Sequence, residues 1–359
     1  MYKILRILIT LLLISSSIYA DLGTTGKIAG QVTDAVTGEP IPFVNVIVMG
    51  TSYGAASDFD GYYSIINIPP GIYEVKGSAI GFNPMTVTNV KVSIDLTTTI
   101  DLQLNETSVQ LEEEVIVVAT RPLVVKDLTA STAIIGADLI KELPVNDLND
   151  VLQLQAGIVV APGGDIHVRG GRSGQVTYQI DGVPVTDAYD GSTVVEVNQN
   201  AVQEMQVISG AFNAEYGQAL SAIVNVVTKD GSNDFNGNIQ MFAGDYVSDK
   251  TDIFWNVNDV NPISIANIEG GFSGPIINDD LFFYVNLRYY KNAGYLYGRR
   301  DYLVTDVASE VPNSGGADFN ITQNGDGEFV SLNPFEKYFG QGKLTYVVMP
   351  GMRLSYNLI

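Results

Sequence analysis

Apolar and polar residues alternate along the last third of the chain, and this alternation restricts the possible fold more than any other feature. Residues 352–358 read Met-Arg-Leu-Ser-Tyr-Asn-Leu without a break in the alternation, and Leu344, Tyr346 and Val348 occupy one side of an earlier segment. Successive side chains of a β-strand point to opposite faces of its sheet. Each segment therefore predicts a strand with one apolar and one polar face.

The connections between these segments alternate in length. Residues 246–262 and 294–334 form long connections, whereas 277–280 and 349–351 form short ones. In outer-membrane β-barrels, tilted strands of about ten residues cross the bilayer, short turns face the periplasm and long loops face outside. We therefore predict that residues 234–359 form about five strands of a transmembrane antiparallel β-barrel. The count is odd and the alternation runs to Ile359, so we expect this barrel to be incomplete within the chain.

Composition favours β-structure and excludes several kinds of site. The 359 residues include 36 glycines and 19 tyrosines, with 46% hydrophobic and 16% charged residues. Without cysteine, and with His167 as the only histidine, disulfide frameworks and zinc-thiolate sites are excluded and zinc catalysis is disfavoured. The formal net charge of −21 argues against nucleic acid as a partner.

The N-terminal residues 1–20 have the features of a secretory signal. Lys3 and Arg6 supply a basic start, residues 7–14 form a short apolar stretch, and Ala20 ends a plausible cleavage site. The apolar stretch is too short to span a bilayer, which disfavours the alternative of a retained membrane anchor. Past this segment no run of 18 apolar residues occurs.

Residues 25–104, the first module, consist of short alternating strands separated by turn residues, a pattern typical of a small β-sandwich. Residues 30–34, 37–41, 58–63 and 70–73 read Gly-Gln-Val-Thr-Asp, Thr-Gly-Glu-Pro-Ile, Asp-Phe-Asp-Gly-Tyr-Tyr and Pro-Gly-Ile-Tyr. In these motifs and their order, the module resembles carboxypeptidase-regulatory-like domains.

The loop from Asp58 to Gly61 begins like a calcium-binding loop but lacks the later acidic ligands. We favour a plain turn in which Asp60 accepts hydrogen bonds from backbone amides and Gly61 is left-handed.

Residues 128–233, the second module, combine a short helix with several strands. A helix is expected from Asp147 as its cap to Gly157 as its terminator, and Asp181-Gly182 predicts a two-residue hairpin turn with positive φ at both residues. A strand is expected over 222–229. With these elements and the motifs between them, in this order, the module resembles the plug domain of TonB-dependent outer-membrane receptors. The motif residues that carry the resemblance are Arg169, Gly170, Gly171, Arg172, Asp181, Gly182, Glu204, Glu215, Tyr216 and Gly217.

The segment Arg169-Gly170-Gly171-Arg172 has two interpretations. Glycines that admit close approach and two arginines could form an anion-binding loop. Since no nucleotide-binding strand-loop-helix frame surrounds the segment, we favour a structural role, with the arginines bonded to carboxylates of the plug or the barrel wall. Glu204, Glu215 and Asp181 are the candidate partners, and His167 is expected to pack rather than to bind a ligand.

Residues 105–127 form a linker between the two modules, with three glutamates before a β-branched run. Given the resemblance, the segment before the plug looks like a TonB box, which adds as a strand to the edge of the energy-transducing TonB protein. Its candidate residues are Glu114, Val115, Ile116, Val117, Val118, Ala119 and Thr120. The alternative is that residues 115–118 form the first strand of the following domain, because strand propensity alone does not separate the two cases.

The resemblance implies a mainly β protein of the Gram-negative outer membrane: a sandwich, an α+β plug and the first strands of a barrel that, in plugged transporters, closes at about 22 strands. It implies TonB-driven uptake of a siderophore, vitamin, oligosaccharide or peptide, without catalysis, metal or cofactor. Expected partners are TonB with its inner-membrane complex, outer-membrane lipid and, in receptors of Bacteroidetes type, a substrate-capturing surface lipoprotein. The competing class is a structural or adhesive surface protein whose C-terminal strands form another sandwich.

Overall fold

The computed structural model describes residues 23–107, 115–118, 131–143, 148–161, 165–187, 189, 193, 195, 197–210, 219–313, 316–349 and 352–359. The chain divides into two compact units, one of residues 1–235, 273–284 and 343–359 and one of 236–272 and 285–342. No helix among the described residues is long and apolar enough to cross a membrane.

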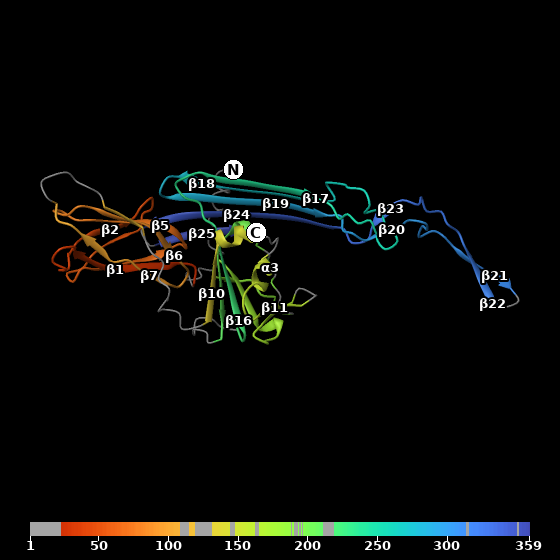
Figure 1. Cartoon of the computed structure of the whole chain (residues 1–359), viewed down its shortest axis with the longest axis horizontal. Coiled ribbons are helices and arrows are strands. Elements are labelled where there is room, and N and C mark those ends of the chain that lie inside the picture. The colour runs from red at the N-terminus through yellow and green to blue at the C-terminus, as the bar shows by residue number, and fades with distance from the viewer. Residues whose placement is uncertain are drawn as a thin grey trace, which may run out of the picture. The chain divides into compact units, whose positions relative to one another are not determined.

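The first module is a two-layer β-sandwich, as predicted (Figure 1). One layer has the order β4-β1-β7, with β8 also paired to β1, and the other has the order β3-β2-β5-β6-β9. These strands are β1 Gly26–Asp34, β2 Asn45–Val48, β3 Gly54–Ala56, β4 Tyr62–Ile68, β5 Gly71–Ser78, β6 Met85–Val92, β7 Thr97–Thr99, β8 Leu102–Leu104 and β9 Val115–Val118. Alternate apolar residues such as Ile28, Val32 and Val46 are fully buried in its core.

Short polar side chains shape the turns of this module. The Asp34 carboxylate accepts hydrogen bonds from the amides of Val36 and Thr37, and these bonds lower the pKa of Asp34. In the loop before β4, Gly61 has a φ of +77°, as predicted. The carboxylate that accepts the amide bonds there belongs to Asp58 rather than to Asp60, so that detail of the expectation was wrong. Asp58 precedes the turn, and its side chain therefore reaches the amides that follow it.

The second module is an α+β domain around a five-stranded sheet of order β10-β15-β16-β13-β14. Its elements are β10 Ser131–Gly136, α2 Ala137–Glu142, α3 Leu148–Gln153, β11 Ile158–Val160, β12 Ile166–Val168, the 3₁₀ turns η1 Ser173–Gln175 and η2 Gln199–Ala201, β13 Val176–Ile180, β14 Val183–Pro184, β15 Val202–Ser209 and β16 Ala222–Thr228. Met205 and Val224 of the sheet share a buried core with Ile140 of α2 and Leu152 of α3.

The helix expected from Asp147 to Gly157 is α3, which ends at Gln153. Gly157 takes a φ of +83°, beyond a turn that follows the helix, and Asp147 lies outside the described residues. Helix α2 was not predicted.

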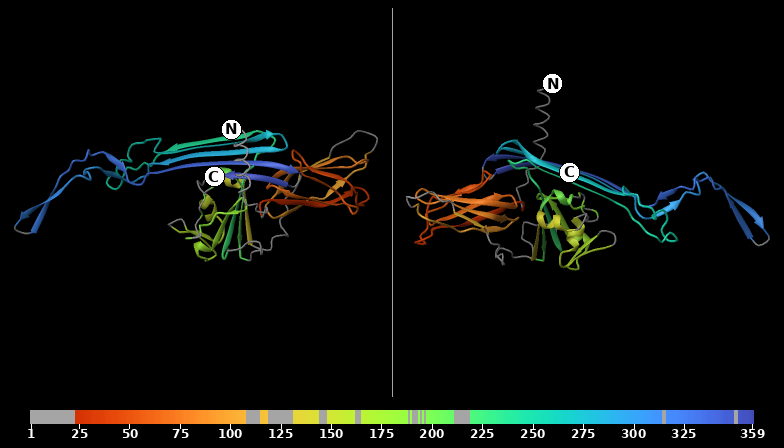
Figure 2. Two further views of the ribbon diagram at one scale, coloured as in Figure 1. Left: turned by 180° about the vertical axis from the view of Figure 1, so that it is seen from behind. Right: turned by 45° about the horizontal axis from the view of Figure 1, so that its top comes forward.

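The C-terminal sheet has five strands in the order β17-β18-β19-β24-β25, matching the predicted number. The five strands are β17 Asn236–Gly244, β18 Ile265–Ile277, β19 Leu281–Asn292, β24 Phe335–Met349 and β25 Met352–Leu358. Figure 2 shows the long strands of this sheet side by side from two further directions. The long connection between β19 and β24 contains two small two-stranded antiparallel sheets. One pairs β20 Tyr297–Arg299 with β23 Phe329–Ser331, and the other pairs β21 Ala308–Asn313 with β22 Gly316–Ile321.

Burial in the C-terminal sheet is inverted relative to a water-soluble sheet. On β19, Leu287 is 60% exposed while its neighbour Asn286 is fully buried. On β24, Lys343 and Thr345 are buried while Leu344 and Tyr346 are exposed. The predicted alternation is therefore present, with the apolar face turned outward.

Candidate functional site

The turn between β13 and β14 places Asp181 at the first of two left-handed positions. Asp181 has a φ of +48° and Gly182 a φ of +77°, as the Asp-Gly sequence predicted. The Asp181 carboxylate accepts hydrogen bonds from the Thr228 amide at 2.9 Å, the Thr228 hydroxyl at 2.6 Å and the Asn357 side-chain amide at 2.7 Å. The turn therefore aims a carboxylate at the end of β16 and at β25.

A second carboxylate, that of Asp230, lies two residues beyond the end of β16. It accepts hydrogen bonds from the Thr345 hydroxyl at 3.0 Å and from Nη1 of Arg353 at 3.1 Å. Thr345 lies on β24 and Arg353 on β25, so these bonds link the end of the second module to two strands of the C-terminal sheet.

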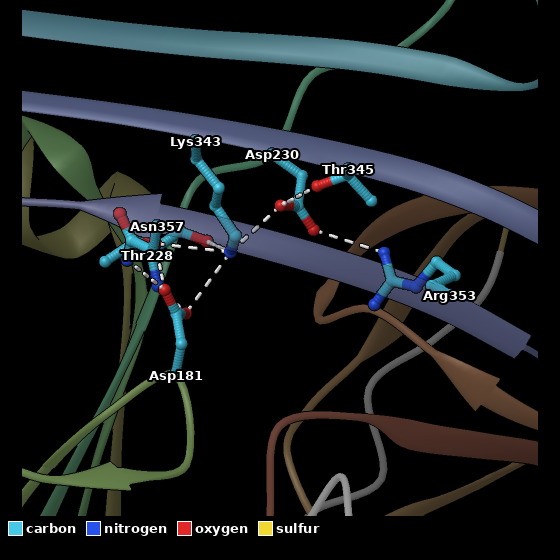
Figure 3. Close-up of polar contacts among 7 residues, drawn as sticks. All are labelled: Asp181, Thr228, Asp230, Lys343, Thr345, Arg353 and Asn357. Atoms are coloured by element: carbon cyan, nitrogen blue, oxygen red, sulfur yellow. Dashed lines mark hydrogen bonds and ion pairs between the residues drawn. The ribbon is translucent and has the colours of Figure 1, made fainter. Parts of the chain in front are cut away.

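Lys343 of β24 joins the two carboxylates (Figure 3). Its Nζ lies 2.9 Å from Oδ1 of Asp230 and 3.3 Å from Oδ1 of Asp181, and it donates to the hydroxyl and carbonyl oxygens of Thr228. The Lys343 side chain is only 5% exposed. A buried ammonium requires such partners, because removing it from water is costly unless charge and hydrogen bonds compensate.

We call these seven residues the Asp181–Asp230 cluster: Asp181, Thr228, Asp230, Lys343, Thr345, Arg353 and Asn357. The cluster holds two carboxylates and two cations, so its formal charges balance. Burial alone would raise the pKa of Asp230, but Lys343 and Arg353, with hydrogen bonds from Lys343 and Thr345, hold that pKa below its ordinary value. The neighbouring cations therefore favour the ionised form of Asp230.

The two plug arginines, Arg169 and Arg172, lie next to uncharged side chains. The Arg169 guanidinium donates to the Ser131 hydroxyl, and Arg172 lies beside Gln175, whose side chain accepts a bond from the Arg172 amide. Within the described part of the chain, neither arginine forms an ion pair with Asp181 or Glu204. Of the candidate carboxylates, Asp181 meets cations from the C-terminal sheet instead.

Of the two glycines in this segment, Gly171 has a close neighbour, whereas Gly170 has open space around it and a left-handed backbone. A Cβ added to Gly171 would lie 2.5 Å from Cβ of Ser221, and Gly170 has a φ of +80°. The ring of His167 lies 3.0 Å from the Gly171 carbonyl oxygen through Nδ1, which agrees with a packing role. Glu215, Tyr216 and Gly217 lie outside the described residues.

Glu204 of β15, one of the candidate carboxylates, interacts with residues of the first module. Its carboxylate, 2% exposed, accepts a hydrogen bond at 2.7 Å from the Ile94 amide and lies 4.0 Å from Nζ of Lys91. Both partners belong to the first module, at and just beyond the end of β6. Glu204 therefore joins the sheet of the second module to strand β6 of the first.

The candidate TonB box is only partly described. Val115, Ile116, Val117 and Val118 form β9, which pairs in parallel with residues 85–88 of β6. Glu114, Ala119 and Thr120 lie outside the described residues. The alternative, a first strand of the following domain, does not match this pairing, because β9 completes a sheet of the preceding module.

Searched across the described residues, the chain holds no cluster of three or more His, Asp or Glu side chains suited to a metal ion. The Asp181–Asp230 cluster itself contains cations at hydrogen-bond distance from both carboxylates. Such an arrangement is suited to holding elements together rather than to proton transfer or metal binding.

Two family models match the chain. Residues 28–117 match the CarboxypepD_reg-like domain and residues 124–224 match the TonB-dependent Receptor Plug Domain. The first match includes three of the four residues of β9, in agreement with the pairing of β9 to the first module.

Three curated relatives show the extent of the similarity. The TonB-dependent transporter Oar of Myxococcus xanthus is 23% identical across 97% of this chain and 34% of its own length. The TonB-dependent receptor P39 of Formosa agariphila is 29% identical across 63% of the chain and 22% of that protein, and the vitamin B12 transporter BtuB of Vibrio vulnificus is 30% identical across 39% and 25%. The chain thus spans about a third or less of the length of these relatives. It carries, in order, the carboxypeptidase-regulatory-like domain and the plug domain of the TonB-dependent receptor family.

Proposed function

We propose that this chain acts in a TonB-dependent outer-membrane receptor that takes up a scarce or bulky ligand by active transport. Siderophores, vitamins, oligosaccharides and peptides are the ligand classes concerned. The two family models and relatives named as a TonB-dependent transporter and a vitamin B12 transporter support this proposal.

The observation that carries the proposal is the inverted burial of the C-terminal sheet, together with the cluster on its polar side. Exposed apolar residues such as Leu287 and Tyr346 suit contact with lipid, whereas buried polar residues such as Asn286 and Lys343 suit contact with a plug in the lumen. An adhesive sandwich in water would bury its apolar face, so the competing class fits this pattern poorly.

In the proposed receptor, the signal at residues 1–20 directs export, the C-terminal strands lie in the outer membrane, and the plug fills the lumen with the first module on the periplasmic side. TonB and its inner-membrane complex supply force through the box at residues 114–120. We include a substrate-capturing surface lipoprotein as a further proposed partner. No bond of the ligand is made or broken, and no metal or cofactor takes part.

The Asp181–Asp230 cluster has a defined role in this scheme. Two carboxylates and two basic side chains join the end of the plug to β24 and β25. Separating them without new partners would leave charges unpaired in a site of low solvent access, which costs several kcal/mol. The cluster therefore keeps the plug seated in the absence of TonB, and pulling must work against it.

The coupling step is tested by cross-linking. Because residues 1–359 contain no cysteine, Ile116→Cys places a single thiol in this part of the receptor. In cells whose TonB carries one cysteine in its periplasmic domain, we expect a disulfide-linked pair that becomes more abundant when the transported ligand is supplied. Ile72→Cys, at an exposed position of β5, is the matched control. If a receptor with Ile116→Cys still supports growth on the ligand but never cross-links to TonB, the box lies elsewhere.

A further inference from the structure

Strand β9 leaves one of its edges open. It stands at the end of the order β3-β2-β5-β6-β9, and among the described residues no strand pairs with its other side. Exposed strand edges present unpaired N–H and C=O groups and are templates for another strand, so proteins usually protect them with charges, proline or bulges. Residues 115–118 read Val-Ile-Val-Val and contain none of these protections.

The side chains of residues 116–118 of β9 are exposed on both faces of the strand. Ile116 is 66% exposed, and Val117 and Val118 are exposed as well. Apolar side chains on an unprotected edge are a signature of a binding surface rather than of a solvated one.

The strand on the inner side of β9 is firmly held. Val87, Val90 and Val92 of β6 are buried in the sandwich core, and the amide of Ile94 just beyond β6 donates to the buried carboxylate of Glu204. Strand β6 therefore offers a fixed template against which residues 115–118 are kept extended.

We propose that the first module is a presenting scaffold: β6 holds residues 115–118 as a preformed edge strand, and a strand of TonB adds to the free edge of β9. This inference rests on the proposed function and on the box at residues 114–120. A segment that is already extended loses less conformational entropy on binding than a free one, so presentation strengthens binding. The first module thereby gains a role in coupling, since it extends its own sheet into TonB.

The experiment locks β9 onto β6. Thr88 and Val118 are register partners, and neighbouring strands lie about 4.8 Å apart, within the range that a disulfide spans. The intact protein with Thr88→Cys and Val118→Cys, extracted from outer membranes in detergent, is titrated with the purified periplasmic domain of TonB after oxidation and after reduction. A second pair, Lys76→Cys with Thr86→Cys, cross-links β5 to β6 and is the control for oxidation itself.

Presentation predicts that the Thr88–Val118 disulfide forms and that the oxidised protein binds TonB with an affinity within about threefold of the reduced protein, or tighter. Binding at least about tenfold weaker after oxidation would overturn the inference, because β9 would then have to leave β6 before TonB binds. The inference would also be overturned if the Thr88–Val118 disulfide does not form under conditions in which the control disulfide does. If the wild-type protein and both reduced variants fail to bind TonB, the box assigned in the proposed function is wrong. This outcome is distinct from weaker binding after oxidation and from failure of the disulfide to form.

An added charge tests the same edge independently. Ile116→Lys places a protecting charge on β9 and should weaken TonB binding about tenfold or more, while thermal unfolding stays unchanged because the side chain is exposed. Ile72→Lys, on β5, should leave binding unchanged. Equal affinities for the two variants would show that the free edge of β9 is not the TonB surface.

Discussion

Burial and neighbouring groups shift the pKa of Asp230 in opposite directions, and the neighbouring groups together have the larger effect. Burial favours the protonated acid, whereas Lys343, Arg353 and the hydroxyl of Thr345 favour the carboxylate, and the pKa of Asp230 ends below the ordinary value of 3.8. A lowered pKa means that the folded state stabilises the ionised carboxyl group more than the unfolded state does. Asp230 therefore links the stability of the cluster to pH.

This link makes a prediction for Asp230→Asn. The contribution of Asp230 is fully present above the ordinary pKa of 3.8 and is lost as pH falls through the lower folded pKa. At pH 7 we expect the variant to be less stable by about 2 kcal/mol, because Lys343 and Arg353 lose a charged partner. The difference in melting temperature between wild type and variant, measured in detergent, should shrink as pH falls below about 4.

Asp252→Asn removes an exposed carboxylate and is the control for net charge. A wild-type advantage over Asp230→Asn that stays constant from pH 7 to about pH 3 would show that Asp230 does not carry this dependence.

Single residues were predictable where the cause is local. Asp181-Gly182 specifies its own turn, and both residues take the positive φ expected. The partners of Asp181 were not predictable, since Asn357 lies 176 residues further along the chain and only the packed structure brings it near. Alternation did place Lys343 and Arg353 on the polar faces of their strands, but periodicity indicates a face and not the carboxylate opposite it.

At the scale of elements, β9 shows the limit of strand propensity. Four β-branched residues predict a strand wherever they fall, but propensity does not say which sheet accepts them. The pairing to β6 depends on the open edge that β6 offers, which a reading of residues 105–127 alone does not contain. Helix α2 was missed for a related reason: six residues are too few to show helical periodicity.

Gly171 makes a prediction about how the loop after β12 packs. A Cβ at this position would lie 2.5 Å from Cβ of Ser221, so Gly171→Ala requires one of the two segments to move. We expect a loss of about 1–3 kcal/mol in the free energy of unfolding, typical of overpacking. Unfolding in urea, monitored through the protease resistance of the second module, would measure this loss.

The double variant Gly171→Ala with Ser221→Gly supplies the control for Gly171→Ala. It removes the Cβ and hydroxyl that the new methyl group meets, so it should regain part of the lost stability. Gly342→Ala, where the added Cβ meets nothing within 4 Å, should cost much less. If Gly171→Ala and Gly342→Ala are equally stable, the loop does not require a glycine for close approach.

At the scale of the whole molecule, two opposite burial patterns coexist in one chain. The first module buries Ile28, Val32 and Val46 and behaves as a sandwich in water. The C-terminal sheet buries Asn286 and Lys343 and exposes Leu287 and Tyr346. The hydrophobic effect favours only the first pattern in water, so the second requires an apolar surrounding for the exposed face.

A matched pair of arginine substitutions tests whether that surrounding is lipid. Leu287 and Ile72 are both apolar and similarly exposed, the first on β19 and the second on β5. If β19 faces the bilayer, Leu287→Arg in the full-length receptor should make folding into lipid vesicles less favourable by about 2–4 kcal/mol near the bilayer centre, and by less near its surface. Ile72→Arg should change it by less than about 0.5 kcal/mol, because a surface side chain in water tolerates charge. Urea titration of the vesicle-inserted protein, read by its heat-dependent mobility in detergent gels, gives both values. Equal effects of the two substitutions would mean that β19 and β5 face the same solvent, and the assignment of the C-terminal sheet to the membrane would then be wrong.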